Sequence, residues 1–152
     1  MRSIRSLFLL LLFFFLGCKS SQNSTLHSGN VAYVSNEGLE TLTLRSTDYG
    51  TNKEDAIENA KRLAFQNLFF RGVPNSPYRD PILGISETEK YREHEDYLKE
   101  FYDNRMYTFI NRSSELISDK KRPIQATVSL TINMRALKKD LQENNMMPKF
   151  GL

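Results

Sequence analysis

The only cysteine of the chain, Cys18, lies in the setting of an export signal. Arg2 and Arg5 open the sequence, residues 7–16 form an unbroken apolar run, and Gly17 precedes the cysteine. A basic start, a short apolar segment and a small residue at the cleavage point are typical of a secretory signal peptide. Ten apolar residues span about 15 Å as a helix, roughly half of a bilayer core, so a permanent transmembrane helix is not expected. A thiol in this position is a candidate for modification rather than for core packing.

Residues 15–18 (Phe-Leu-Gly-Cys) resemble the lipobox that ends the signal of bacterial lipoproteins. Phe15 and Leu16 stand where that family has Leu and a small residue. The resemblance implies that residues 1–17 are removed, that Cys18 carries a thioether-linked diacylglycerol, and that the new N-terminus accepts a further acyl chain such as palmitate. Two or three chains anchor firmly, because each buried CH₂ contributes about 0.8 kcal/mol. Ordinary cleaved export without lipid is the alternative.

Residues 18–30 predict a lipidated cysteine followed by a flexible tether, because residues 19–30 are polar and rich in Ser and Asn. Lys19 follows the cysteine at the position where Asp retains enterobacterial lipoproteins at the inner membrane. The resemblance therefore implies delivery to the outer membrane of a Gram-negative cell. The tether has no acidic cluster of the kind used for surface display, which favours the periplasmic face.

The mature chain is nearly neutral. Removal of residues 1–17 takes away Arg2 and Arg5, so Lys+Arg falls from 21 to 19 against 18 Asp+Glu, which leaves a net charge of +1. Such a balance removes the main argument for nucleic-acid binding, which requires a strong basic surface, and we expect no nucleic-acid partner. One cysteine cannot form a disulfide within the chain, so the folded part, expected as a single domain over residues 31–152, must be held together by its core.

The charged segment 86–104 holds the other candidates for chemistry. Four acidic side chains recur there at helical spacing: Glu89, Glu93, Asp96 and Glu100. They could form a metal or cationic-partner site, but interspersed basic residues favour a solvated face. His94-Glu95 begins like a zincin motif, yet no second His follows four residues later, and the other His, His27, lies in the tether. We therefore expect no metal, no cofactor and no catalytic residue.

Residues 71–85 carry three prolines and two glycines, which rules out a helix or a central strand. An irregular stretch of this length inside a domain is either functional or a packed Ω-type loop, and both interpretations stay open. Its candidates for contact with a partner are Tyr78, Arg79 and Asp80.

The first half of the domain predicts a hairpin and a helix. Residues 31–34 and 39–46 are rich in strand formers and flank a turn with Gly38. Thr51 and Glu54 have the spacing of a capping box. Alanines recur every four residues on the helix that follows, which lets it approach a sheet closely: Ala56, Ala60 and Ala64.

The second half predicts two more helices and two more strands. A second capping box, at Ser86 and Glu89, would start a helix that runs to about Asn104. Residues 106–117 predict a strand, the basic turn 118–123 follows, and residues 124–133 alternate cleanly between apolar and polar side chains. Asn133 can cap a last helix.

This order predicts an α+β domain, in which a small antiparallel sheet of about four strands is covered by the alanine-rich helix and two further helices. Residues 39–70 combine an alternating Thr/Leu strand, a Tyr-Gly break and a helix with alanines at every fourth position. They are similar to small envelope lipoproteins related to the N-terminal domain of flagellar assembly protein T. That resemblance implies an envelope accessory rather than an enzyme, and it brings no catalytic residue.

Two functions remain open. The first is a lipid-anchored, non-enzymatic envelope module that binds a protein partner or supports an envelope assembly. The second is a small ligand-binding or hydrolytic periplasmic lipoprotein that uses the 71–85 loop and the acidic helix. A deep pocket that joins Asp80, His94 and Asp96 would favour the second function, and a shallow surface there would favour the first.

Overall fold

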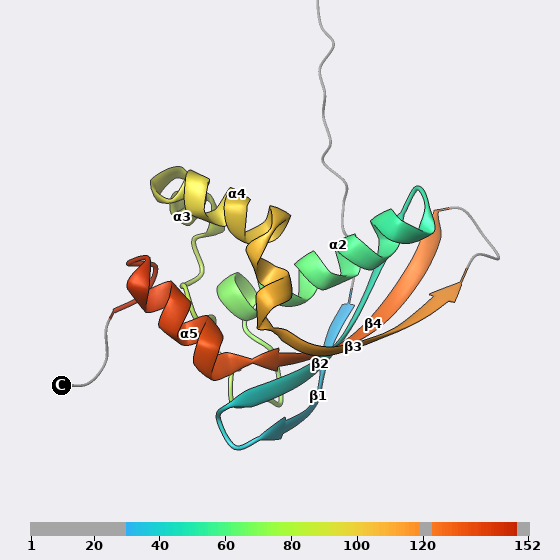
Figure 1. Cartoon of the computed structure of the whole chain (residues 1–152), viewed down its shortest axis with the longest axis horizontal. Helices are drawn as coiled ribbons and strands as arrows, with labels where there is room; N and C mark the ends of the chain where they lie inside the picture. The colour runs from blue at the N-terminus through green and yellow to red at the C-terminus, as the bar shows by residue number, and fades with distance from the viewer. Residues whose placement is uncertain (1–29, 119–122, 149–152) are drawn as a thin grey trace, which may run out of the picture.

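The computed structural model describes residues 30–118 and 123–148, in which helices gather on one side of an antiparallel sheet (Figure 1). The elements are β1 (Asn30–Glu37), β2 (Thr41–Gly50), α2 (Lys53–Gln66), η2 (Asn67–Arg71), α3 (Glu87–Glu93), α4 (Glu95–Asp103), η3 (Arg105–Phe109), β3 (Ile110–Ser118), β4 (Ile124–Asn133) and α5 (Met134–Glu143). The four strands lie in the order β1-β2-β4-β3, and all neighbours are antiparallel. The expected α+β fold is confirmed.

The two central strands decide which face of the sheet is buried. Leu42 and Leu44 of β2 are buried, and so is every second residue of β4: Ile124, Ala126, Val128, Leu130 and Ile132. The residues between them are mostly Thr, Ser and Gln and are only half-buried. The predicted alternation of both strands is confirmed, and the helices cover the apolar face only.

Helix α2 crosses that apolar face. Ala56, Ala60 and Ala64 are completely buried, as the fourfold spacing predicts. Gly50 ends β2 where the helix begins, and a Cβ there would lie 2.2 Å from the backbone nitrogen of Ala56. The strand therefore has to end in glycine for the helix to turn back this tightly onto the sheet.

The cap of α2 differs from the one expected. Asn52, not Thr51, is the N-cap residue: its Oδ1 accepts a 2.8 Å hydrogen bond from the backbone N–H of Asp55, and its Nδ2 donates to the carboxylate of Asp55. The capping box of Thr51 and Glu54 is wrong by one residue. Asn caps more strongly than Thr, and Asn52 has the extended backbone that a cap requires.

An aromatic cluster joins α2 to the next helices. The ring of Phe101 lies 5.3 Å from Phe65, 5.0 Å from Phe69 and 5.8 Å from Phe109, measured between centroids. Phe69 reaches the cluster because α2 continues into η2, a single π-helical stretch that the sequence did not predict. The core therefore depends on aromatic rings contributed by α2, η2, α4 and η3.

The charged segment forms two helices rather than one. The chain leaves helical geometry at His94 (φ −136°), and the side chain of Ser86 makes no capping hydrogen bond, so the second capping box is wrong. Helix α3 buries no residue, whereas α4 buries Leu98, Phe101 and Tyr102. The break lets α4 turn its apolar side to the core while α3 stays at the surface.

The strand expected from residue 106 begins later, at Ile110. Met106 and Phe109 lie in the 3₁₀ turn η3 and are buried there, which explains why this apolar stretch resembles a strand in sequence. The last helix agrees with expectation, because Asn133 caps α5 by accepting a 2.9 Å bond from the N–H of Ala136.

Several predictions concern residues outside the described ranges. Cys18, the tether, and the basic turn at 120–122 are among them. In the described part of the chain, no helix combines the length and the apolar character needed to cross a bilayer.

Candidate functional site on the open sheet face

The loop of residues 72–85 divides the three predicted contact residues. Tyr78 is buried, its hydroxyl donates a 3.0 Å hydrogen bond to the carbonyl of Leu39, and the ammonium of Lys138 lies 4.6 Å from its ring centroid. The side chains of Arg79 and Asp80 are 80% and 88% exposed. Tyr78 therefore belongs to the packing of the domain, and only Arg79 and Asp80 are available to a partner.

Two apolar residues of this loop pack against η2, the continuation of α2. Val73 and Leu83 are buried, and the N–H of Leu83 donates 2.9 Å to the carbonyl of Phe69. Gly72 has a φ of +74°, and a Cβ there would lie 1.9 Å from the carbonyl oxygen of Arg79. This geometry is that of a packed loop, one of the two interpretations left open by the sequence.

The acidic row lies on the solvent side of α3 and α4. All four members, Glu89, Glu93, Asp96 and Glu100, are exposed. Within residues 30–118 and 123–148, no three His, Cys, Asp or Glu side chains come close enough to hold a metal ion. Neither of the two surface hollows described below is lined by Asp80, His94 or Asp96.

A row of polar side chains crosses the uncovered face of the sheet. Ser35 of β1 pairs with Thr43 of β2, Thr43 pairs with Thr131 of β4, and Thr131 pairs with Arg112 of β3. We call these four residues the central row. The hydroxyls of Thr43 and Thr131 are 3.1 Å apart and hydrogen-bonded. Cross-strand pairs of this kind add roughly 0.2–1 kcal/mol to a sheet.

Both edge strands are irregular where they meet this row. The register of β1 shifts between Tyr33 and Ser35, and the register of β3 shifts between Ile110 and Arg112. A β-bulge bends its strand and redirects the neighbouring side chains, and bulges are common beside functional sites. Two bulges on opposite edges thus converge on one row.

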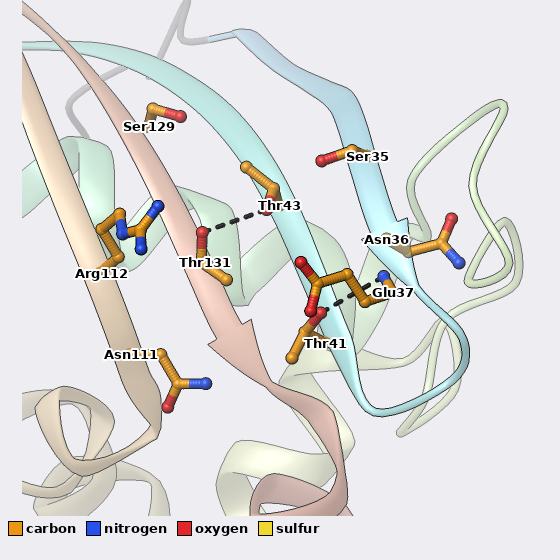
Figure 2. Close-up of a pocket in the computed structure, with 9 residues that line it drawn as sticks. All are labelled: Ser35, Asn36, Glu37, Thr41, Thr43, Asn111, Arg112, Ser129 and Thr131. Carbon is orange, nitrogen blue, oxygen red and sulfur yellow. Dashed lines mark hydrogen bonds between the residues drawn. The ribbon is translucent and has the colours of Figure 1, made fainter.

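A hollow of about 450 Å³ lies over the central row (Figure 2). Its lining is polar throughout: Ser35, Asn36, Glu37, Thr41, Thr43, Asn111, Arg112, Ser129 and Thr131. Figure 2 shows Arg112 on the β3 side and Glu37 on the β1–β2 side, with the threonines between them. The lining side chains are hydroxyls, amides, one carboxylate and one guanidinium, all of which can hydrogen-bond a polar ligand.

The cations of this face lack partners within the described ranges. Arg112 and, one row away, Arg45 are exposed, and neither lies within 4.0 Å of a described carboxylate. Glu37 is the only acid of the hollow, and its backbone N–H donates 3.3 Å to the hydroxyl of Thr41. The hollow therefore has one positive and one negative end.

A second hollow, of about 710 Å³, lies between the β1–β2 turn and α5. Two of its three basic residues have acidic partners: Arg135 pairs with Glu40, and Lys139 lies 3.7 Å from Glu143. The third, Lys138, lies over the ring of Tyr78. Each cation of this hollow is therefore already engaged within the domain, which makes the central row the stronger candidate site.

The most perturbed titratable groups lie away from this site. The hydroxyl of Tyr97 on α4 donates a 2.6 Å bond to Asp140 of α5, whose other oxygen pairs with Arg105. Burial, together with Asp140, raises the pKa of Tyr97. Burial and the neighbouring Glu58 raise the pKa of Tyr107 to about 12. These groups connect elements of the helix layer.

No protein-family model, no curated protein and no solved structure matches the chain. The resemblances to lipoproteins and to flagellar assembly protein T therefore stay predictions. The central row was not predicted as a site, although Thr43 and Thr131 belong to the polar faces that the alternation of β2 and β4 predicts. The missing information was the pairing of strands and the position of the two bulges.

Proposed function

We propose that this protein is a lipid-anchored, non-enzymatic module of a Gram-negative envelope, which holds a partner against the open face of its sheet. The observation that carries the binding part is the central row, because bulges on both edge strands converge on it to form a polar hollow.

The anchoring part rests on the sequence. A basic start, an apolar run of ten residues and the single cysteine after Gly17 support cleavage and lipidation at Cys18. In this proposal the lipid holds the domain at the periplasmic side of the outer membrane, and the tether gives it reach. The partner is a protein or another component of an envelope assembly.

Replacement of Cys18 tests the anchor. We expect Cys18→Ser to move the protein from the membrane fraction to the soluble fraction and to abolish incorporation of labelled palmitate, because the serine hydroxyl does not accept the thioether-linked lipid. The unchanged thermal melting curve of the purified variant is the control. A variant that stays in membranes with its label intact contradicts lipidation at this position.

Photo-cross-linking in cells tests the contact face. A benzophenone side chain placed at Ser129, in the hollow, is expected to give adducts with an envelope component, because benzophenone inserts into C–H bonds of proteins and glycans alike. The same group at Lys99, exposed on α4, is the matched control. Adducts from Lys99 alone, or from neither position, contradict a contact through the open face.

A further inference from the structure

We infer that the hollow over the central row binds an anionic sugar unit, meaning a hydroxyl-rich ring that carries one carboxylate or phosphate group. This inference rests on the proposed function and names the chemical class of its partner. Three properties of the hollow lead to it: the pair of hydroxyls on Thr43 and Thr131, the opposite charges at its two ends, and a lining made only of polar residues.

The hydroxyls of the row have unused hydrogen-bonding capacity. A hydroxyl offers one hydrogen and two lone pairs, so the single bond between Thr43 and Thr131 leaves one hydrogen and several lone pairs free. Ser35 and Ser129 line the hollow beside them. Groups that donate and accept match sugar hydroxyls, which do the same, whereas an inorganic anion would use the donors only.

The charges orient such a ligand. The guanidinium of Arg112 presents a planar fork of donors that fits a carboxylate or a phosphate, and no described carboxylate lies within 4.0 Å of it. Glu37, on the opposite side of the hollow, accepts hydrogen bonds from hydroxyls and repels a second anion. The preferred ligand therefore has its anionic group at the β3 side and its hydroxyls towards β1 and β2.

Size and polarity distinguish a sugar from a protein anchor. A volume of about 450 Å³ falls within the range of small-ligand sites, roughly 300–1,000 Å³. Protein partners bind through apolar and aromatic anchors that fill desolvated pockets, and all nine residues that line this hollow are polar. The lining therefore favours a hydroxylated ligand over an inserted side chain.

The experiment is calorimetric titration of the full-length chain, purified in a detergent whose headgroup is not a sugar. Galacturonate is expected to bind saturably and galactose at least tenfold more weakly, because the two differ in the carboxylate. Arg112→Gln should weaken the binding of galacturonate at least tenfold. Arg45→Gln, an exposed arginine on the same face outside the lining, is the matched control and should change the affinity less than twofold.

Two further arms complete the test. Thr131→Val, which replaces the hydroxyl by a methyl group of similar size, should weaken the binding of both galacturonate and galactose. Polygalacturonate distinguishes the two sources of such a unit: tighter binding than the monomer indicates a polymer, and equal binding per site indicates a free sugar. Either result supports the inference.

Three outcomes overturn it: no saturable binding of galacturonate, equal weakening by Arg45→Gln, or inorganic phosphate that binds as tightly as galacturonate. Failure of the inference is separable from failure of the proposed function. If position 129 gives a protein adduct but no sugar binds, the sugar inference is overturned and the proposed binding function stands. If neither cross-linking nor sugar binding is seen, both proposals are overturned.

Discussion

Tyr97 and Tyr107 make the stability of the helix layer depend on pH in the alkaline range. Burial raises the pKa of both phenols above the ordinary value of 10.0, and Asp140 and Glu58 add to the effect. A group whose pKa is higher in the folded than in the unfolded state favours the folded state while it is protonated. That contribution is complete below pH 10 and is lost as the pH rises through the folded pKa.

We therefore expect the free energy of unfolding to fall as the pH rises from about 10 towards 12, the pKa given for Tyr107. Urea unfolding at a series of pH values measures it, and phenolate absorbance should show tyrosines that titrate late. Tyr107→Phe is the control, since it should remove part of the fall. Stability that rises over this range contradicts the assignment.

A prediction about stability also concerns Asn52, the N-cap residue of α2. Asn52→Ala removes the acceptor of the Asp55 N–H and should cost about 1 kcal/mol. Asn52→Ser keeps a capping oxygen without placing a second carboxylate beside that of Asp55, and should retain most of that stability. Chemical denaturation of both variants measures the difference, and equal midpoints for Asn52→Ala and the original chain would show that the cap is not used.

At the scale of elements, the contact between α2 and the sheet is the most sensitive part of the fold. Ala60 is completely buried between them, so Ala60→Leu should overpack the contact and cost about 1–3 kcal/mol. Ala32→Leu makes the same change at an exposed position of β1 and should stay within about 0.5 kcal/mol. Thermal melting compares the two, and a melting temperature unaltered by Ala60→Leu refutes the packing.

The elements that the sequence predicted are those in which one periodicity dominates. The alternation of β4 predicts a strand with one buried face, and the fourfold alanines of α2 predict a helix with one buried side. The π-helical turn η2, the break at His94 and the delayed start of β3 depend on how the aromatic cluster packs, and none of them leaves a local signal. The candidate site shares this limit, because its polar residues are visible in sequence but its assembly needs strand pairing.

At the scale of the whole molecule, the structure predicts that the folded part is independent of the leader and the tether. A chain without residues 1–29 keeps all of β1 and should melt in one cooperative transition. A chain cut after Asn133 is the comparison, because it loses three buried side chains of α5: Met134, Leu137 and Leu141. Gradual melting of the first chain would contradict the assignment of a single domain.

Strand β1 is both the first described element and one edge of the sheet, and β2 is the only strand with which it forms a ladder. Any tension that reaches the domain from the preceding residues therefore enters at Asn30 and passes through a single antiparallel ladder. Force directed along the strand loads all hydrogen bonds of that ladder together, in shear. Force directed away from the sheet opens them one after another, so the mechanical strength of the molecule depends on the angle at which it is pulled.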